Sequence, residues 1–230
     1  MINQFERTIN LIGNENVCRL QKSKVLVVGV GGVGGYVCEA LARAGVGTIT
    51  IIDGDVVSET NINRQIIALH STMGKSKVEV MKARLLDINP SINVEAINLF
   101  LTKDNMNKIN YANYDYIVDA VDNVTVKIGL SKLAFDNGYN IVSCMGTGNK
   151  LKPELFEIDD IYNTSVCPLA KVMRRELKKI GVNKLKVLYS KEEPKSVVGG
   201  ERVPASISFC PSVAGLRIAE FVICELINNK

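Results

Sequence analysis

The sequence predicts an α/β fold of the doubly wound class, with a mostly parallel sheet. Short apolar runs rich in β-branched residues alternate with amphipathic segments through the first 150 residues. The first run, 24–30, is apolar on both faces and leads into a glycine-rich turn, as expected for a strand buried in a parallel sheet. No linker or repeat interrupts the rest of the 230 residues, so we expect one domain, with a core at 1–150 and an extension at 151–230.

Each element follows from its own pattern. In the core we expect strands at 24–30, 48–52, 92–97, 114–119 and 141–145, and helices at 33–44, 75–88 and 124–137. The helix at 75–88 carries Val78, Met81 and Leu85 on one face and ends before Pro90. In the extension we expect strands at 152–158 and 185–189, a helix at 168–180, a polar stretch at 191–204, a final strand and a helix at 211–227.

Composition limits the function classes. The 28 basic and 24 acidic residues give a net charge of +4, which allows a polyanionic partner without requiring one. No apolar run reaches the roughly 18 residues of a membrane span, and the first residues lack a signal-peptide core, so we expect a cytoplasmic protein without membrane contact. The six cysteines form no CxxC pair, which argues against paired zinc knuckles and favours buried, reduced thiols.

The glycine-rich turn predicts a nucleotide site. Gly29, Gly31, Gly32 and Gly34 satisfy G-x-G-x-x-G between a strand and a helix, where backbone N–H groups and the helix N-terminus attract phosphates. Asp53 ends the second strand about 20 residues on, where a carboxylate commonly holds ribose hydroxyls. This Rossmann-like signal alone fits NAD, FAD, S-adenosylmethionine or ATP.

The polar stretch after the second strand favours ATP. An enzyme that splits a triphosphate must neutralise charge as pyrophosphate leaves, and a dehydrogenase has no such need. Arg64 offers a fork of donors for phosphate oxygens, and Lys77 begins the next helix. Asp122 follows the fourth strand, at the sheet end where ligands bind, and is placed to hold Mg²⁺ on the phosphates.

Five separated motifs together resemble the ubiquitin-activating-enzyme superfamily, including the ThiF- and MoeB-like activators of sulfur carriers. They are the glycine turn, Asp53-x-Asp55-x-Val57, Asn61-x-Asn63-Arg64-Gln65, Gly74-x-x-Lys77 and Asp119-x-x-Asp122-Asn123. The resemblance implies an adenylating domain that uses ATP and Mg²⁺. It implies that Asp53 holds the ribose and Asp122 the magnesium. The implied nucleotide site also includes Asp55, and the implied phosphate ligands are Asn61, Arg64, Gln65 and Lys77.

The resemblance also implies an assembly. Members supply an arginine near the N-terminus to the ATP of the partner subunit, and Arg7 is the candidate here, with a solvated surface arginine as the simpler alternative. Phe5, Leu11 and Ile12 could dock on a second subunit of a homodimer.

The absence of paired zinc ligands argues against the sulfur-carrier activators. The tail of the chain resembles another branch of the superfamily, the tRNA threonylcarbamoyladenosine dehydratases. The tail motifs are at 159–180, 187–194, 199–204 and 208–215. That branch implies a tRNA substrate whose threonine carboxylate is adenylated and then attacked from its own side chain, so no protein nucleophile is needed. The alternatives are an adenylyltransferase for a ubiquitin-like sulfur carrier, an NAD-dependent oxidoreductase and a non-catalytic nucleotide-binding scaffold. Sulfur-transfer proteins are candidate partners.

Three further features have a plain and a functional interpretation. Cys167 is the nearest candidate for a carrier-linked cysteine, but an incidental thiol at a helix start explains it as well. The outward residues of the 168–180 helix, namely Lys171, Arg174, Arg175, Lys178 and Lys179, could meet tRNA phosphates or simply be solvated. The single histidine, His70, could act as a base or pack.

Overall fold

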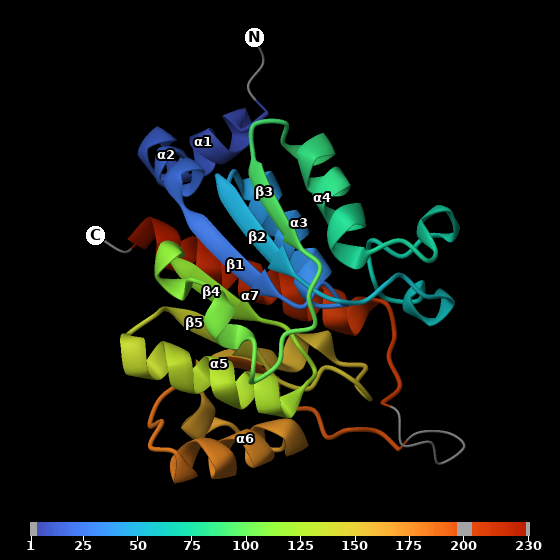
Figure 1. The fold of residues 1–230 in the computed structure, drawn as a ribbon, viewed down its shortest axis with the longest axis vertical. Coiled ribbons are helices and arrows are strands. Elements are labelled where there is room, and N and C mark those ends of the chain that lie inside the picture. The colour runs from blue at the N-terminus through green and yellow to red at the C-terminus, as the bar shows by residue number, and fades with distance from the viewer. Residues whose placement is uncertain (1–3, 197–203, 229–230) are drawn as a thin grey trace.

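The structure is a computed structural model that describes residues 4–196 and 204–228, and its centre is one twisted sheet (Figure 1). The seven strands lie in the order β3-β2-β1-β4-β5-β7-β6. Their bounds are β1 Lys24–Val28, β2 Thr48–Ile52, β3 Asn93–Ile97, β4 Tyr116–Asp119, β5 Ile141–Cys144, β6 Phe156–Asp160 and β7 Lys186–Ser190. All neighbours pair in parallel except β6 and β7. The predicted parallel sheet, extended by strands of the last third, is confirmed.

Helices cover both faces of the sheet, as expected of a doubly wound fold. One face carries α3 (Gly34–Ala44), α4 (Lys77–Ile88) and α7 (Phe209–Asn228), and the other carries α5 (Val124–Asn137) and α6 (Pro168–Lys179) (Figure 1). Strand β1 shows why. Val25 and Val27 join the cluster under α3 and α7, whereas Leu26 and Val28 join the cluster under α5. A strand buried on both faces needs apolar residues throughout rather than in alternation.

The N-terminal residues form two helices that the sequence analysis did not predict. They are α1 (Glu6–Ile12) and α2 (Asn14–Lys22), and they precede β1. The guanidinium of Arg19 donates to the carbonyl of Ile227 at 2.9 Å, which ties α2 to the last turn of α7. Phe5 lies buried against Gly45, where an added Cβ would stand 3.3 Å from its ring. The expectation that Phe5 docks on a second subunit is therefore wrong, because its own chain covers it.

The extension differs from the prediction in two places. The strand expected at 152–158 begins as a short 3-10 turn, Pro153–Leu155, and β6 starts only at Phe156, since proline has no N–H for a strand ladder. The final strand is also wrong for the residues that the structure describes: 204–208 form a loop, and α7 already starts at Phe209. Pro211 falls in the first turn of α7, where a missing N–H is tolerated.

Two expectations drawn from composition can be compared with the fold. Within residues 4–196 and 204–228, no helix is both long and apolar enough to cross a membrane, the 20-residue α7 included. All six cysteines are free thiols, and Cys38, Cys144, Cys167 and Cys210 are buried as predicted. Cys18 is half-buried, and Cys224 is exposed on α7, so for these two the expectation of burial is wrong.

Candidate functional site

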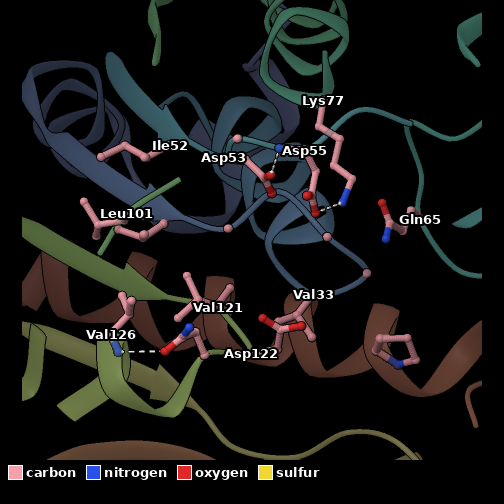
Figure 2. A pocket seen from close by; sticks show the side chains of 18 of the residues that line it. Val33, Ile52, Asp53, Asp55, Gln65, Lys77, Leu101, Val121, Asp122 and Val126 are labelled. Carbon is pink, nitrogen blue, oxygen red and sulfur yellow. Dashed lines mark hydrogen bonds and ion pairs between the residues drawn. The ribbon is translucent and has the colours of Figure 1, made fainter. Parts of the chain in front are cut away.

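A cavity of about 510 Å³ opens at the carboxyl ends of β1, β2 and β4 (Figure 2). It gathers every predicted site residue except Gly34 and Arg7. The residues on its wall are Gly29, Gly31, Gly32, Asp53, Asp55, Asn61, Arg64, Gln65, Lys77 and Asp122. They come from five separate segments of the chain. The sheet brings these segments together because loops at the carboxyl ends of parallel strands share one edge.

The glycine turn forms the floor of the cavity for steric reasons. Gly29 adopts a φ of 93°, and a Cβ there would lie 2.7 Å from the carbonyl oxygen of Ala120. A Cβ on Gly34 would lie 1.8 Å from the carbonyl oxygen of Gly29. Gly34 is not on the cavity wall, and its missing side chain has a different consequence. It allows α3 to start directly against β1, which aims the helix N-terminus at the cavity.

Asp53 ties the glycine turn to the end of β2. Its Oδ2 accepts the N–H of Val30 at 2.7 Å, and its Oδ1 accepts the N–H of Asp55 at 2.8 Å. The carboxylate thus has a structural task that the sequence did not indicate. Each oxygen still has a second lone pair for a ligand hydroxyl.

Lys77 and Asp55 form an ion pair on the upper wall of the cavity (Figure 2). The distance from Nζ to Oδ2 is 2.8 Å, and the Lys77 side chain is only 7% exposed while that of Asp55 is 51% exposed. The N–H of Lys77 also donates to the carbonyl of Asp55 at 3.0 Å. Asp55 therefore fixes the lysine at the first position of α4, with its ammonium group at the cavity wall.

The 58–65 turn arranges the other polar side chains. Asn61 accepts the N–H of Ser58 at 3.2 Å through Oδ1, and its carbonyl accepts the N–H of Gln65 at 2.9 Å. Arg64 Nη1 donates to the carbonyl of Thr60 and to Oδ1 of Asn63, both at 2.9 Å. Nε and Nη2 of Arg64 make no such bond to the residues that the structure describes. One side of the guanidinium is thus fixed and the other is available.

Gln65 is a buried polar residue at the cavity wall. Its Oε1 has no hydrogen-bond partner among the described residues. A buried polar atom without a partner costs about 1–3 kcal/mol, so such atoms in native proteins commonly face water or a ligand. Gln65 is one of the residues on the cavity wall, and its Nε2 lies 3.9 Å from the position that a Cβ on Gly31 would take. The amide nitrogen therefore borders the glycine turn, whereas Oε1 is enclosed by protein.

Asp122 stands on the loop after β4, and its carboxylate faces the open centre of the cavity (Figure 2). It is exposed, and no described residue makes an ion pair with it. The next residue, Asn123, caps α5 by accepting the N–H of Val126 at 3.1 Å, which holds the loop in place. Mg²⁺ usually takes one or two carboxylates together with phosphate oxygens and water. The described residues offer no cluster of three or more potential metal ligands. Asp122 places a single carboxylate at the cavity, and one carboxylate is what a magnesium ion shared with phosphate oxygens and water can use.

Beneath this loop lies a fully buried polar cluster, Asp119–Lys127–Ser143, which the sequence analysis missed. Lys127 Nζ lies 3.1 Å from Oδ2 of Asp119 and 3.2 Å from Oγ of Ser143, and both charged side chains are 0% exposed. The hydroxyl of Ser143 donates to Oδ2 of Asp119 at 2.5 Å. A lysine among the inward positions of the 124–137 helix was the available signal. Burial raises the pKa of the neighbouring Cys144 to about 12, so that thiol stays protonated.

The extension closes one side of the cavity through Ser206 and Pro211, beside Thr147 of the core. Asn63 Nδ2 donates to the carbonyl of Ser206 at 3.1 Å. Asn149 exchanges two hydrogen bonds with Ala205, at 2.7 and 2.8 Å. Residues 204–208 therefore lie against both the 58–65 turn and the loop after β5. Ser206 and Pro211 of the extension thus line the same cavity as the residues of the core.

The extension also holds a buried carboxylate, Glu192, which belongs to the tail motif at 187–194. Glu192 accepts the N–H groups of Leu151 and Lys152, at 2.8 to 3.0 Å. Burial opposes ionisation, but these hydrogen bonds outweigh it and lower the pKa of Glu192. The buried Lys150 donates to the carbonyl of Glu192 at 2.7 Å. The loop after β5 is therefore fixed by charge as well as by packing.

The other candidates lie outside the cavity. Arg7 is exposed on α1, which lies beside the start of β1 and not at the carboxyl ends of the strands (Figure 1). His70 is exposed in a 3-10 turn, His70–Thr72, and does not line the cavity. Cys167 is 2% exposed and directly precedes α6. None of these three side chains lines the cavity of its own chain.

Comparison with known proteins identifies the family. Residues 5–219 match the ThiF family. The chain belongs to the ThiF family. Among ThiF proteins similar to it, the tRNA threonylcarbamoyladenosine dehydratase of Bacillus subtilis is 40% identical, over all of this chain and 96% of that relative. The Escherichia coli protein of that name is 38% identical over 76% of this chain and 65% of the relative.

Solved structures agree with this placement. The E. coli tRNA N6-threonylcarbamoyladenosine dehydratase in complex with ATP matches with a TM-score of 0.90 and 31% identity, over 97% of this chain and 93% of that one. A second structure of the same enzyme contains AMP. The E. coli MccB structure with ATP has a TM-score of 0.71 at 22% identity, which shows a shared fold only.

Proposed function

We propose that this ThiF protein catalyses the ATP-dependent dehydration of threonylcarbamoyladenosine in tRNA, through an acyl-adenylate. The observation that carries the proposal is the gathering of Arg64, Lys77 and Asp122 around one glycine-lined cavity. The choice of substrate is supported by the full-length similarity to dehydratases of that name. The absence of CxxC pairs in the sequence also favours it over a sulfur-carrier adenylyltransferase.

The first step is the attack of the threonine carboxylate on the α-phosphorus of ATP. A carboxylate oxygen forms a bond to phosphorus, and the bond from phosphorus to pyrophosphate breaks. Negative charge grows on the leaving pyrophosphate, and the ammonium of Lys77 and the free side of the Arg64 guanidinium would neutralise it. A magnesium ion held by Asp122 would supply further positive charge on the phosphates.

The second step is ring closure. A nucleophile of the same side chain attacks the activated acyl carbon, and AMP leaves with the former carboxylate oxygen, so water is lost overall while ATP becomes AMP and pyrophosphate. Both reacting groups belong to one side chain, which gives a high effective concentration without a protein nucleophile. The burial of Cys144 and Cys167 agrees with a mechanism that needs no thiol.

In this proposal Asp53 receives the ribose hydroxyls, while Asn61 and Gln65 contact the phosphates from the side. The protein would work in the cytoplasm as a homodimer in which Arg7 reaches the partner's ATP. Arg7 is exposed and remote from its own cavity, which supports a role in trans. Sulfur-transfer proteins remain candidate partners.

The test is conversion of threonylcarbamoyl-tRNA by the purified protein, read by nucleoside mass spectrometry. We expect the cyclic nucleoside and one AMP per product only when ATP and Mg²⁺ are present, and much slower product formation with Lys77→Met. The proposal fails if the tRNA stays unchanged while a small carrier ending in Gly-Gly supports pyrophosphate exchange. Binding of NAD instead of ATP would refute the adenylation chemistry as well.

A further inference from the structure

Positive charge is concentrated in one short segment of the chain. Residues 168–186 contain seven basic residues and one acidic residue, whereas the whole chain has a net charge of only +4. The other residues therefore carry a net charge of −2. The basic residues of the segment are Lys171, Arg174, Arg175, Lys178, Lys179, Lys184 and Lys186. Such local enrichment in a nearly neutral chain points to a polyanionic partner at that surface.

The fold leaves most of these charges at the outside of α6. Helix α6 buries Ala170, Met173 and Leu177 against α5 and the sheet, and it forms the outermost layer on that side (Figure 1). Lys171, Arg175 and Lys178 recur at i, i+4 and i+7, so they share one exposed face. We call these three residues, with Lys179, Lys184 and Lys186, the α6 basic face.

Not every basic side chain of the segment is available. Arg174 is half-buried, and its Nη1 donates to the carbonyl of Thr164 at 2.8 Å and also to the hydroxyl of that residue. The prediction that Arg174 points outward is therefore wrong, because it holds the loop before α6. Arg175 and Lys179 share the carboxylate of Glu176, at 2.7 and 2.9 Å.

Lys171, Lys178 and Lys184 are exposed and have no ion-pair partner within the part of the chain that the structure describes. These three lysines can therefore receive phosphates without breaking a bond within the protein. The two on α6 are seven residues apart, or about 10 Å along the helix axis.

The first turn of α6 adjoins the nucleotide cavity. A Cβ on Gly146 would lie 3.9 Å from Cβ of Leu169 and 4.0 Å from Sγ of Cys167. The residue after Gly146, Thr147, lines the cavity itself. The α6 basic face therefore starts close to the cavity and runs away from it, which suits a substrate whose reacting group enters the cavity while its backbone continues outside.

The chemistry of this face favours RNA over a protein partner. The centre of a protein interface is usually depleted of charged residues and rich in aromatic residues. Within residues 168–186, the large apolar residues that are exposed are only Val172 and Ile180, each just over one-third exposed. A row of unpaired ammonium groups instead matches a regularly repeated negative charge. We propose that the α6 basic face binds the phosphate backbone of the tRNA beside the modified nucleotide, an inference that rests on the proposed function.

The experiment compares two double variants with the same change in charge. Lys171→Glu/Lys178→Glu alters the α6 basic face. Lys22→Glu/Lys24→Glu alters two exposed lysines at the opposite end of the sheet, where α2 ends and β1 begins, and neither makes an ion pair with a residue that the structure describes. Binding of threonylcarbamoyl-tRNA is measured by fluorescence anisotropy at salt concentrations from about 50 to about 200 mM. Over this range, binding that depends on phosphate contacts weakens steeply. ATP binding and unfolding by urea are measured in parallel.

We expect the first variant to bind tRNA about tenfold more weakly at 0.1 M salt and to lose about 1.5 from the slope of log K against log salt, because each phosphate contact contributes about 0.7–0.9. Its ATP affinity and urea midpoint should match those of the wild type, and the control variant should bind tRNA normally. Equal tRNA affinity and slope in the two double variants would overturn the docking proposal. Failure of the wild-type protein to dehydrate the tRNA would instead overturn the proposed function, whichever surface binds RNA.

Discussion

Replacement of Lys127 by methionine should destabilise the fold strongly, although no residue of the cavity changes. The ammonium group of Lys127 is fully buried and lies 3.1 Å from Oδ2 of Asp119. Methionine keeps most of the volume of the side chain but leaves the carboxylate with only the hydroxyl of Ser143 and, at 3.3 Å, the N–H of Val121. The perturbation therefore leaves a buried negative charge without a counter-charge.

The magnitude follows from the burial of the pair. Removal of one partner of a buried ion pair costs about 3–5 kcal/mol. In a protein of this size about 1 kcal/mol lowers the melting temperature by roughly 2–4 °C, so the expected loss is about 6–20 °C. Lys132→Met on the same helix is the matched control. Lys132 pairs with Asp136 at 2.5 Å, but both side chains are more than 40% exposed, and such surface pairs contribute about 0–1 kcal/mol.

A second variant separates charge from packing. Asp119→Asn/Lys127→Met removes both charges and keeps a side chain that can bond to Ser143 and Val121, so it should recover most of the stability that Lys127→Met loses. The assay is urea unfolding followed by far-UV circular dichroism, with equal m-values as the check on two-state behaviour. The argument is refuted if Lys127→Met costs no more than Lys132→Met, or if the double variant is no more stable than the single one.

Three further outcomes test the cavity itself. Gly34→Ala places a methyl group 1.8 Å from the Gly29 carbonyl oxygen, so we expect little soluble folded protein, whereas Gly31→Ala, whose nearest neighbour would be 3.9 Å away, should fold normally in the same expression assay. Lys77→Met should lower kcat/KM for ATP about 10²–10³-fold with an unchanged urea midpoint, since the lost group acts on transition-state charge; an unaltered rate would exclude the assigned role. Asp122→Asn should raise the Mg²⁺ concentration for half-maximal activity about tenfold or more at saturating ATP, and an unshifted Mg²⁺ titration would place the ion elsewhere.

Local pattern was enough to predict the core of the fold. The strand at 48–52 and the helix at 124–137 were predicted with the bounds that the structure has, because hydrophobic periodicity, glycine and proline act over only a few residues. The α1 and α2 helices were missed. Both are short: α1 has seven residues and buries none of them, and α2 is amphipathic, with Val17 and Leu20 buried, but has only nine residues. Their place depends on distant contacts, such as that of Arg19 with the end of α7.

The sequence by itself determined the chemistry of the site. Residue type and spacing along the chain suffice to show which groups are present. They predict a site for a nucleotide and its phosphates from the glycine turn, Asp53, Arg64, Lys77 and Asp122. Only the tertiary structure decided what each group is bonded to. It showed that Asp55 holds Lys77.

The tertiary structure also revealed features that no local window contains. Arg174 is turned inward, and Lys127 is buried between Asp119 and Ser143, which come from two different strands. Residues 204–208 complete the cavity from the far end of the chain. Such contacts join residues that are brought together by sheet order and helix packing. Their formation depends on burial and distance in the folded chain, which no short window of sequence contains.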